Sequence, residues 1–276
     1  MTEEAKFFQI EKDGPVIIWR FCNPPKNLWT IDTGTEFAQL ENEFYEDPDL
    51  RIGVFTSAMP DVFIQHFDVS ILVNMGETLL KEKATAPTPR RVGFRRDSKP
   101  IIAAINAPLA GGGLERVMSF DFRFMSRTAW ASQGEVNVGI LPGGGGTQRM
   151  PRLIGMAKAL ELQLLGRPIY ADEAERIGLI TRACDPLQLM PEAIAFAKEL
   201  ATRPPFAVSL IRRCIYEGMS MSLEDGLAME SELFKETIKS GEALERMRAY
   251  VALGQDAQRS LEAREQEERE QQSQSG

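Results

Sequence analysis

The sequence has few of the residues that most often bind metals or form disulfide bonds. Its 276 residues include only three cysteines and one histidine. The cysteines, Cys22, Cys184 and Cys214, are widely spaced and form no Cys-x-x-Cys pair, so neither a zinc site nor a disulfide framework is expected. We therefore expect small buried thiols and no bound metal.

Long apolar stretches and an excess of positive charge are also missing. The longest conspicuously uncharged stretch, Pro100 to Leu114, contains two prolines, Asn106 and three glycines, which disfavours a membrane span. The net charge of −8 disfavours a general attraction to nucleic acid. The acidic N-terminal sequence MTEEAKFFQI lacks the features of a targeting signal. We expect a cytoplasmic protein that binds neither nucleic acid nor membrane.

The first half of the chain alternates strand-like and helix-like segments. Residues 6–21 form two strand-like runs around Asp13 and Gly14, which predicts a β-hairpin. Further segments of this alternating kind are helices over residues 30–45 and from 111, and strands over 51–58, 99–109 and 121–126. Such an order predicts an α/β fold.

The second half is mostly helical. Apolar residues at helical spacing predict helices over residues 156–166, 171–178, 189–201, 205–218 and 222–240. Residues 77–98 alternate in charge and contain two prolines, so we expect an exposed connection there. From residue 256 the chain is rich in Gln, Glu and Arg, which predicts a polar, disordered tail.

Three consecutive glycines, Gly111, Gly112 and Gly113, precede a predicted helix. Backbone N–H groups at the start of a helix have no partner within it, and glycines there let a ligand oxygen approach them. Glu115 follows in the first turn. The same residues would equally allow tight packing of strand on helix, with Glu115 complementing the helix dipole. Both interpretations are open on spacing alone.

A second carboxylate favours a catalytic interpretation. Glu135 lies twenty residues after Glu115, and the glycine-rich PGGGGTQR follows it. Two carboxylates near one oxyanion site suit proton transfer beside a thioester carbonyl, because one moves a proton while the other positions water. PGGGGTQR lacks the GK[ST] ending of a nucleotide-binding loop.

The stretch KPIIAAINAPLAGGGLERVMSFDFRFMSRTAWASQGEVNVGILPGGGGTQRMPRLIG, continued by LLGRPIYADEAERIGLITRAC, resembles the crotonase (enoyl-CoA hydratase/isomerase) superfamily. The resemblance covers roughly residues 7–250. It implies the α/β crotonase (ClpP/crotonase-like) fold of repeated ββα units. The implied organisation is a crotonase core over residues 1–200, a C-terminal helical trimerisation region over 201–255 and the tail over 256–276. The implied assembly is a homotrimer or a dimer of trimers.

The resemblance also implies an activity on acyl-CoA thioesters without a separate cofactor, since coenzyme A is part of the substrate. The implied reaction is reversible addition of water to a trans-2-enoyl-CoA, with Glu115 activating water for attack at C3 and Glu135 exchanging the proton at C2. The presence of both carboxylates favours hydration. The alternatives are a Δ3,Δ2-enoyl-CoA isomerase, another acyl-CoA hydrolase or decarboxylase of the family, and a non-catalytic acyl-CoA-binding protein.

The family's oxyanion hole maps onto the backbone N–H groups of Gly112 and Phe67. Phe67 lies in FIQHFDV, residues 63–69, where the family usually has F-[AS]-A-G-x-D. Gln65 therefore replaces a small residue, and His66 replaces the usual glycine.

By the same resemblance, the predicted substrate-binding and CoA-binding residues are Lys26, His66, Asp68, Gly111 and Gly113. His66 has two possible roles, a structural hydrogen bond in the loop or substrate selection and acid–base work. Lys26 is a candidate partner for the phosphates of coenzyme A. The four arginines of RRVGFRR, residues 90–96, are either further phosphate partners or part of a solvated loop.

Overall fold

The computed structural model describes residues 5–82, 99–252 and 254, and the chain forms two units, Met1–Arg203 and Pro204–Gly276. The arginine-rich stretch and the tail expected from residue 256 lie outside the described residues.

A six-stranded sheet forms the centre of the first unit, in the order β1-β2-β3-β4-β6-β9. Its strands are β1 (Phe8–Asp13), β2 (Val16–Phe21), β3 (Ile52–Ser57), β4 (Ile101–Ile105), β6 (Phe122–Ser126) and β9 (Arg182–Cys184). β1 and β2 are antiparallel, and every later pair is parallel. The predicted hairpin is confirmed, with Gly14 at φ +58 in its turn.

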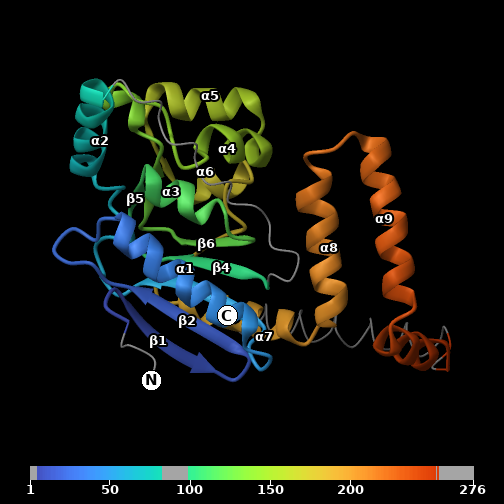
Figure 1. Ribbon diagram of the computed structural model, residues 1–276. Helices are drawn as coiled ribbons and strands as arrows, with labels where there is room; N and C mark the ends of the chain where they lie inside the picture. Colours follow the sequence, from blue (N-terminus) through green and yellow to red (C-terminus); the bar gives the residue numbers. More distant parts are fainter. Residues whose placement is uncertain (1–4, 83–98, 253, 255–276) are drawn as a thin grey trace. The chain divides into compact units, whose positions relative to one another are not determined.

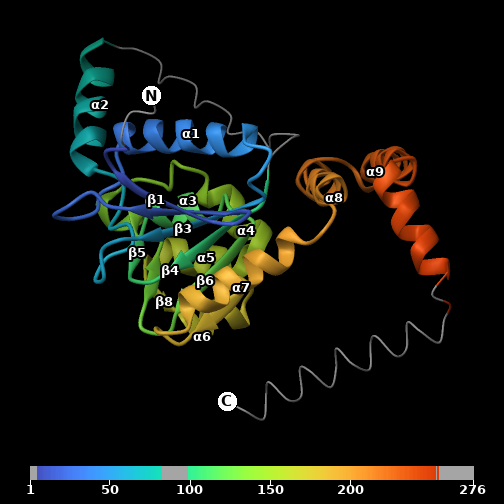
Figure 2. The ribbon, with the colours of Figure 1, turned by 90° about the horizontal axis from the view of Figure 1, so that it is seen from below.

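Helices cover both faces of this sheet. Successive residues of a strand point to opposite faces, and in β3 Phe55 joins the core cluster that contains Phe37 of α1 (Ile31–Glu46). The neighbouring Val54 joins the second cluster, which contains Ala193 of α7 (Leu189–Ala201). Figures 1 and 2 show α1 and α7 on opposite sides of the sheet. The strands are therefore buried on both faces, as parallel sheets usually are.

A second, smaller sheet has three strands in the order β5-β7-β8. Its strands are β5 (Leu109–Ala110), β7 (Trp130–Ser132) and β8 (Pro168–Tyr170). The helices that follow are α3 (Gly112–Val117), the 3-10 turn η1 (Glu135–Val138), α4 (Gly146–Ile154), α5 (Met156–Leu165) and α6 (Ala171–Arg176). Two strands and a helix thus recur as β1–β2–α1, β4–β5–α3 and β6–β7–α4. The short β8 and β9 lie in the half that we predicted from sequence to be mostly helical.

One prediction about the chain's connections was wrong. Helix α2 spans Val69–Glu82, so residues 77–82 are helical where we expected an exposed connection over 77–98. This segment, ETLLKE, consists mainly of good helix formers, and Glu77 and Lys81 form an i,i+4 ion pair at 3.8 Å. The prolines that suggested a connection lie further along the chain, outside the described residues.

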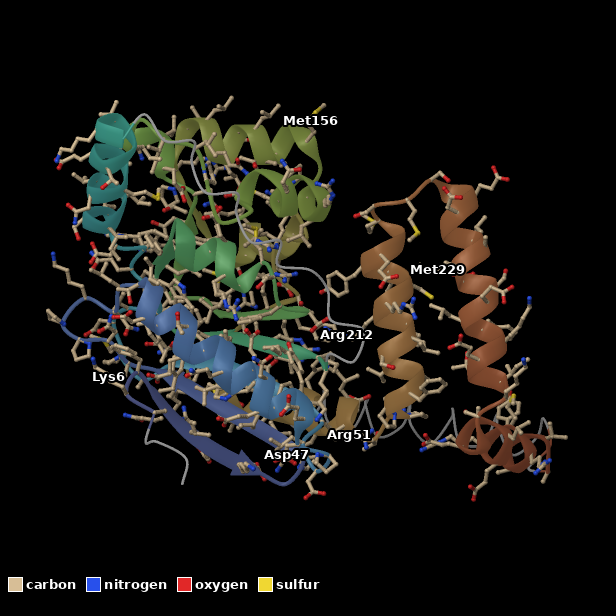
Figure 3. The ribbon with its side chains drawn as sticks, in the orientation of Figure 1. Lys6, Asp47, Arg51, Met156, Arg212 and Met229 are labelled. Carbon is tan, nitrogen blue, oxygen red and sulfur yellow. The ribbon has the colours of Figure 1, made fainter. Side chains whose placement is uncertain are left out.

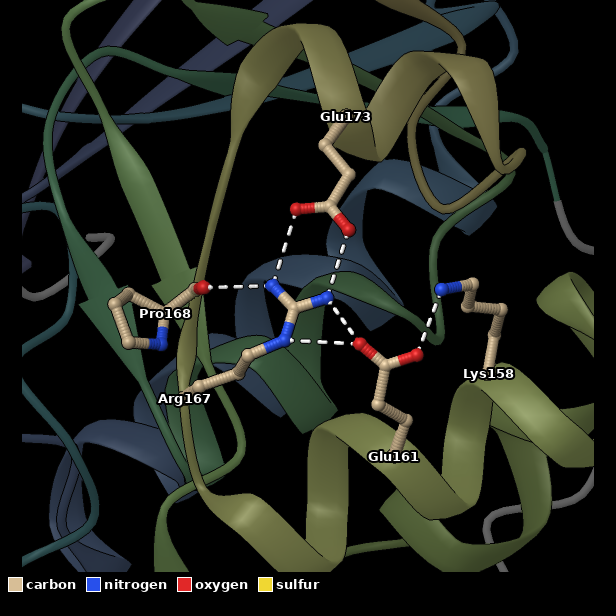
Figure 4. A network of polar contacts seen from close by, with 5 residues as sticks. All are labelled: Lys158, Glu161, Arg167, Pro168 and Glu173. Carbon is tan, nitrogen blue, oxygen red and sulfur yellow. Dashed lines mark hydrogen bonds and ion pairs between the residues drawn. The ribbon is translucent and has the colours of Figure 1, made fainter.

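A polar network ties α5 to α6 across the start of β8 (Figure 4). Arg167 Nη2 lies 2.6 Å from Glu161 Oε1 and 2.7 Å from Glu173 Oε1. The preceding residue, Gly166, is left-handed at φ +58, and a Cβ placed on it would lie 2.7 Å from Asn137 Nδ2. The network therefore fixes a loop that packs directly against η1.

The second unit contains the helical pair α8 (Pro205–Gly218) and α9 (Leu223–Ile238), followed by helical residues over 241–252. α8 begins with a proline, whose fixed φ suits a first turn, and Ser222 caps α9 by accepting from the Asp225 N–H. Met229 of α9 points toward α8 (Figure 3), and its Cε lies 4.0 Å from the position of a Cβ on Gly218.

Candidate active site

Helix α3 carries Glu115 into the interior of the first unit. The residue is only 4% exposed, and its Oε1 accepts hydrogen bonds from the N–H groups of Gly144 (2.8 Å) and Gly146 (2.7 Å). A Cβ on Gly144 would lie 2.7 Å from Glu115 Oε2, and one on Gly146 would lie 3.0 Å from Oε1. The second glycine cluster therefore lets bare backbone surround a buried carboxylate.

Arg149 holds this glycine loop in place. Its Nη1 donates to the carbonyl oxygen of Gly144 at 2.7 Å. Gly145 has φ +109, a conformation that residues with a side chain rarely adopt. The glycine loop and the first residue of α4, Gly146, thus contact the Glu115 carboxylate.

Glu135 begins η1, after β7 ends at Ser132 and Gln133 and Gly134 have made the connection. Gln133 Nε2 donates to Glu135 Oε1 at 2.8 Å, and Gln133 is 1% exposed. A Cβ on Gly146 would lie 3.0 Å from Glu115 Oε1 and 3.1 Å from the amide carbon of Gln133. The Gln133 amide therefore lies close to both carboxylates. Within the described residues, the buried Glu135 Oε2 and Gln133 Oε1 have no hydrogen-bond partner.

Burial raises the pKa of both carboxyl groups above the ordinary value of 4.5. For Glu115, loss of solvent has the largest effect, the N–H groups of Gly146 and Gly144 oppose it, and the charge of Glu135 adds to it. For Glu135, burial is opposed by its own backbone and by the Gln133 amide. Both groups are therefore more basic than a solvated glutamate.

Two backbone N–H groups lie next to each other beside these carboxylates. Phe67 forms a parallel bridge with Trp29, in which Trp29 N–H donates to His66 O and Asp68 N–H donates to Trp29 O, both at 2.9 Å. In such a bridge the N–H of Phe67 itself points away from Trp29. A Cβ on Gly112 would lie 3.4 Å from the Phe67 nitrogen and 2.9 Å from its Cβ.

Neither of these two N–H groups donates to another of the described residues. Gly112 is the first residue of α3, so its N–H has no partner one turn earlier. The side chain of Phe67 is half-buried and packs against the larger core cluster. The site thus contains two adjacent unpaired backbone donors.

The glycines on either side of Gly112 have different surroundings. Gly111 is left-handed at φ +50, its N–H donates to Ser132 O at 2.9 Å, and a Cβ there would lie 3.0 Å from Glu135 Oε1. Gly113 packs against Ile64, since a Cβ on it would lie 2.8 Å from Ile64 Cβ. Glycine suits both positions because neighbouring side chains leave too little room for a Cβ.

The other residues predicted from sequence lie around the loop before α2. Lys26 lines a pocket together with Gln65, Leu109 and Trp130, among other residues. His66 Nδ1 lies 2.7 Å from the carbonyl oxygen of Phe67.

Asp68 caps helix α2. Its carboxylate accepts hydrogen bonds from Ser70 Oγ (2.7 Å) and the Ser70 N–H (2.9 Å). These bonds lower the pKa of Asp68, and the charges of His66 and Lys26 lower it slightly further. The structure therefore gives Asp68 a structural role at the end of the loop.

Two residues of the site were not predicted from the sequence, Gln133 and Asn27. Asn27 holds the loop before α2 through hydrogen bonds. Asn27 is fully buried at φ +52, and its Nδ2 donates to Phe63 O (2.6 Å) and Ser57 Oγ (3.0 Å). Its side-chain oxygen accepts from the Asn23 N–H, and its carbonyl accepts from the Gln65 N–H. An asparagine after Pro-Pro-Lys was the available signal, because asparagine tolerates left-handed backbone.

Residues 5–82, 99–252 and 254 include no cluster of three His, Cys, Asp or Glu side chains arranged to hold a metal ion. In the same residues, no helix combines the length and the apolar character that a membrane crossing requires.

Comparisons with known proteins agree with this geometry. Residues 11–257 match the family model described as enoyl-CoA hydratase/isomerase. The chain is 35% identical to a short-chain-enoyl-CoA hydratase of Clostridium acetobutylicum, with 88% of this chain and 93% of the relative covered. It is 31% identical to a crotonyl-CoA hydratase of Syntrophomonas wolfei, with 84% and 90% covered.

Solved structures show the same fold. The crystal structure of an enoyl-CoA hydratase from Bacillus anthracis matches with a TM-score of 0.78 and 28% identity over 90% of this chain and 96% of that one. Pseudomonas aeruginosa DspI matches with a TM-score of 0.80 and 27% identity over 91% and 95%. The predicted α/β crotonase fold is confirmed, and the chain belongs to the enoyl-CoA hydratase/isomerase family.

Proposed function

We propose that this protein is an enoyl-CoA hydratase, which adds water reversibly to the double bond of a trans-2-enoyl-CoA. The observation that carries the proposal is a pair of carboxylates, the buried Glu115 and the half-buried Glu135, both close to the Gln133 amide and beside two unpaired backbone N–H groups. Relatives named short-chain-enoyl-CoA hydratase and crotonyl-CoA hydratase support a short enoyl chain as substrate.

In this proposal the thioester oxygen lies between the N–H groups of Phe67 and Gly112. Addition at C3 moves electrons onto that oxygen and produces an enolate. Donors already aimed at the oxygen stabilise the charge as it develops, and each is worth about 3 kcal/mol in comparable sites. The position of Gly112 against Phe67 supports this assignment.

The two carboxylates divide the proton transfers. Ionised Glu115 takes a proton from the water whose oxygen forms a bond to C3, and protonated Glu135 gives its proton to C2. After the addition Glu115 holds the proton taken from water and Glu135 is ionised. Glu115 then releases its proton to solvent and Glu135 takes one up, so one water is consumed in net terms and both carboxyl groups return to their starting states. Burial raises the pKa of both groups, which makes each a better proton acceptor than a solvated glutamate. The division of roles between them follows the resemblance to the family. Glu135 Oε2, which has no partner in the described residues, is the oxygen proposed to carry that proton.

We further propose that Lys26 binds a phosphate of coenzyme A, and that the reaction needs no separate cofactor. Lys26 lines the pocket that Gln65 also lines, next to the loop of the oxyanion donors. Its position in this pocket supports the proposal, because the CoA moiety extends away from a thioester held at those donors.

The proposal includes a homotrimer or a dimer of trimers. Large apolar side chains remain exposed on α8 and α9, namely Phe206, Ile211, Ile215, Leu223, Leu227 and Phe234. Exposed apolar surface of this extent is typical of an interface. The cytoplasmic location stays a prediction from the sequence.

Product analysis separates the proposed reaction from its alternatives. The protein is incubated with crotonyl-CoA and, separately, with 3-butenoyl-CoA, in the presence of EDTA, and the products are resolved by liquid chromatography and mass spectrometry. We expect 3-hydroxybutyryl-CoA from crotonyl-CoA, 18 mass units heavier. Conversion of 3-butenoyl-CoA without hydration would indicate an isomerase, free CoA a hydrolase, and binding without products a non-catalytic protein.

A further inference from the structure

We propose that His66 is a positioning residue that fixes the direction of the Phe67 N–H through a hydrogen bond to the carbonyl oxygen of Phe67. This inference rests on the proposed function, because it concerns the donor that would bind the thioester oxygen. It also assigns a role to the histidine that stands where the family pattern usually has glycine.

The hydrogen bond has a defined direction. His66 Nδ1 lies 2.7 Å from the Phe67 carbonyl oxygen, and a carbonyl oxygen can only accept. Nδ1 therefore carries the hydrogen. In the neutral ring this leaves Nε2 without a hydrogen, so the contact also selects the tautomer.

Both peptide groups that flank Phe67 are anchored. The peptide that contains its N–H is held by its carbonyl, His66 O, which accepts from the Trp29 N–H at 2.9 Å. The peptide that contains its carbonyl is held twice, by the imidazole at Phe67 O and by the Asp68 N–H, which donates to Trp29 O at 2.9 Å. Among the described residues, the imidazole of His66 is the one side chain that hydrogen-bonds to either of these two peptide groups.

The loop reaches this geometry without a glycine-like conformation. Among the described residues Asn27 is the one non-glycine residue with positive φ, so His66 has an ordinary backbone. A Cβ on Gly111 would lie 3.8 Å from His66 Cβ and 3.0 Å from Glu135 Oε1. His66 thus borders both the glycine run and the site of the C2 proton transfer.

Loss of the imidazole hydrogen bond should weaken stabilisation of the transition state more than binding of the substrate. An oxyanion donor contributes most when negative charge has developed on the oxygen, so a misdirected donor lowers kcat more than it changes KM. Without the imidazole contact, we expect kcat to fall about 10- to 50-fold and KM to change less than about threefold. Removal of a whole donor would cost more, about 100-fold or above.

Three substitutions separate the hydrogen bond from the shape of the ring. His66→Asn keeps an N–H donor the same number of bonds from Cβ as Nδ1. His66→Gln moves that donor one carbon further out, and His66→Leu removes it. As a matched control, Ser70→Ala removes a different side-chain hydrogen bond from the same segment, the 2.7 Å bond to Asp68. We expect Asn to retain most of kcat, Gln and Leu to lose it, and Ser70→Ala to retain it.

A second measurement does not depend on turnover. Butyryl-CoA labelled with ¹³C at the carbonyl has no double bond to hydrate, and its C=O stretching frequency falls when hydrogen-bond donors polarise it. The frequency is measured by difference infrared spectroscopy with the ligand bound to saturation. We expect a clear fall with the unmutated protein, His66→Asn and Ser70→Ala, and a smaller fall with His66→Gln and His66→Leu.

The outcomes distinguish this inference from the proposed function. If bound butyryl-CoA shows no fall in the unmutated protein, the oxyanion hole itself is wrong. If the fall and kcat are normal in the unmutated protein and equally normal in His66→Leu, the inference is overturned and the proposed function stands. If His66→Leu does not fold, equal kcat in the Asn and Gln variants overturns it instead.

Discussion

Gly112 and Phe67 approach so closely that a Cβ on Gly112 would lie 2.9 Å from Phe67 Cβ. Substitution of Gly112 by alanine must therefore move the loop, and with it the Phe67 N–H. We expect Gly112→Ala to lower kcat for crotonyl-CoA hydration by about 100-fold, the usual cost of losing an oxyanion donor. Steady-state kinetics measure the loss.

Gly76→Ala is the matched control, because a Cβ on Gly76 in α2 would meet nothing within 4 Å. This variant should retain full activity and should be slightly more stable, since alanine is a better helix former than glycine. An equal loss of activity in both glycine variants would contradict the account.

The raised pKa values of Glu115 and Glu135 predict a stability cost at neutral pH. Because burial raises each pKa in the folded state, that state holds its proton more tightly than the unfolded chain does. The stability contributed by the proton is fully present below the ordinary value of 4.5 and is lost as pH rises through the folded pKa. Glu115→Gln and Glu135→Gln should therefore melt at a higher temperature than the unmutated protein at pH 7–8.

The same difference in melting temperature should shrink as pH falls through and below the ordinary value of 4.5, because both carboxyl groups then become protonated in the unfolded chain as well as in the folded state. Thermal unfolding between about pH 3.5 and pH 8 measures it. The exposed Glu43, changed to Gln, is the control and should leave the melting temperature unchanged at each pH. A lower melting temperature of both active-site variants at pH 8 would show that the buried charges are not costly.

The Gln133 amide lowers the pKa of Glu135, so its removal should raise that pKa further. Gln133→Met keeps the volume of the buried side chain and removes the 2.8 Å hydrogen bond. Where ionised Glu135 is required, as in removal of the C2 proton during dehydration, the acidic limb of the pH–rate profile should move to higher pH. The profile for dehydration of 3-hydroxybutyryl-CoA tests this, and an unmoved limb would contradict the role given to Gln133.

Lys26 should matter only for substrates that carry the CoA phosphates. We expect Lys26→Met to raise KM for crotonyl-CoA several-fold and to leave kcat nearly unchanged, because a remote phosphate contact contributes uniform binding. Crotonyl-pantetheine, which has the same thioester but no phosphate, is the matched control substrate. If KM rose equally for both thioesters, Lys26 would act on the loop and not on the phosphates.

Much of the fold was predictable because its signals are local. The hairpin around Gly14 and the strand and helix on either side of the glycine run have periodicities that a single stretch of sequence contains. The three-residue strands β8 and β9 were missed because segments so short have no measurable period and form only when a neighbouring strand pairs with them. The helical residues 77–82 were not predicted, because the two prolines further along favoured a connection over the whole of residues 77–98.

The candidate site was predictable where a motif marks it, as at Glu115 and the glycines. Its burial and its hydrogen bonds depend on contacts between distant segments. Gln133 looks like an ordinary polar residue in the sequence, and only its position close to both Glu115 and Glu135 makes it important. Asn27 likewise acquires its role from partners thirty or more residues away.

The most direct test of the two-carboxylate account follows the loss of enoyl-thioester absorbance when purified protein meets crotonyl-CoA, beside Glu115→Gln and Glu135→Gln. The account predicts hydration by the unmutated protein and a fall in kcat of at least about 100-fold in each variant, the usual contribution of a general acid or base. Hydration that persists in either variant, or no hydration by an unmutated protein that still binds crotonyl-CoA, would contradict it.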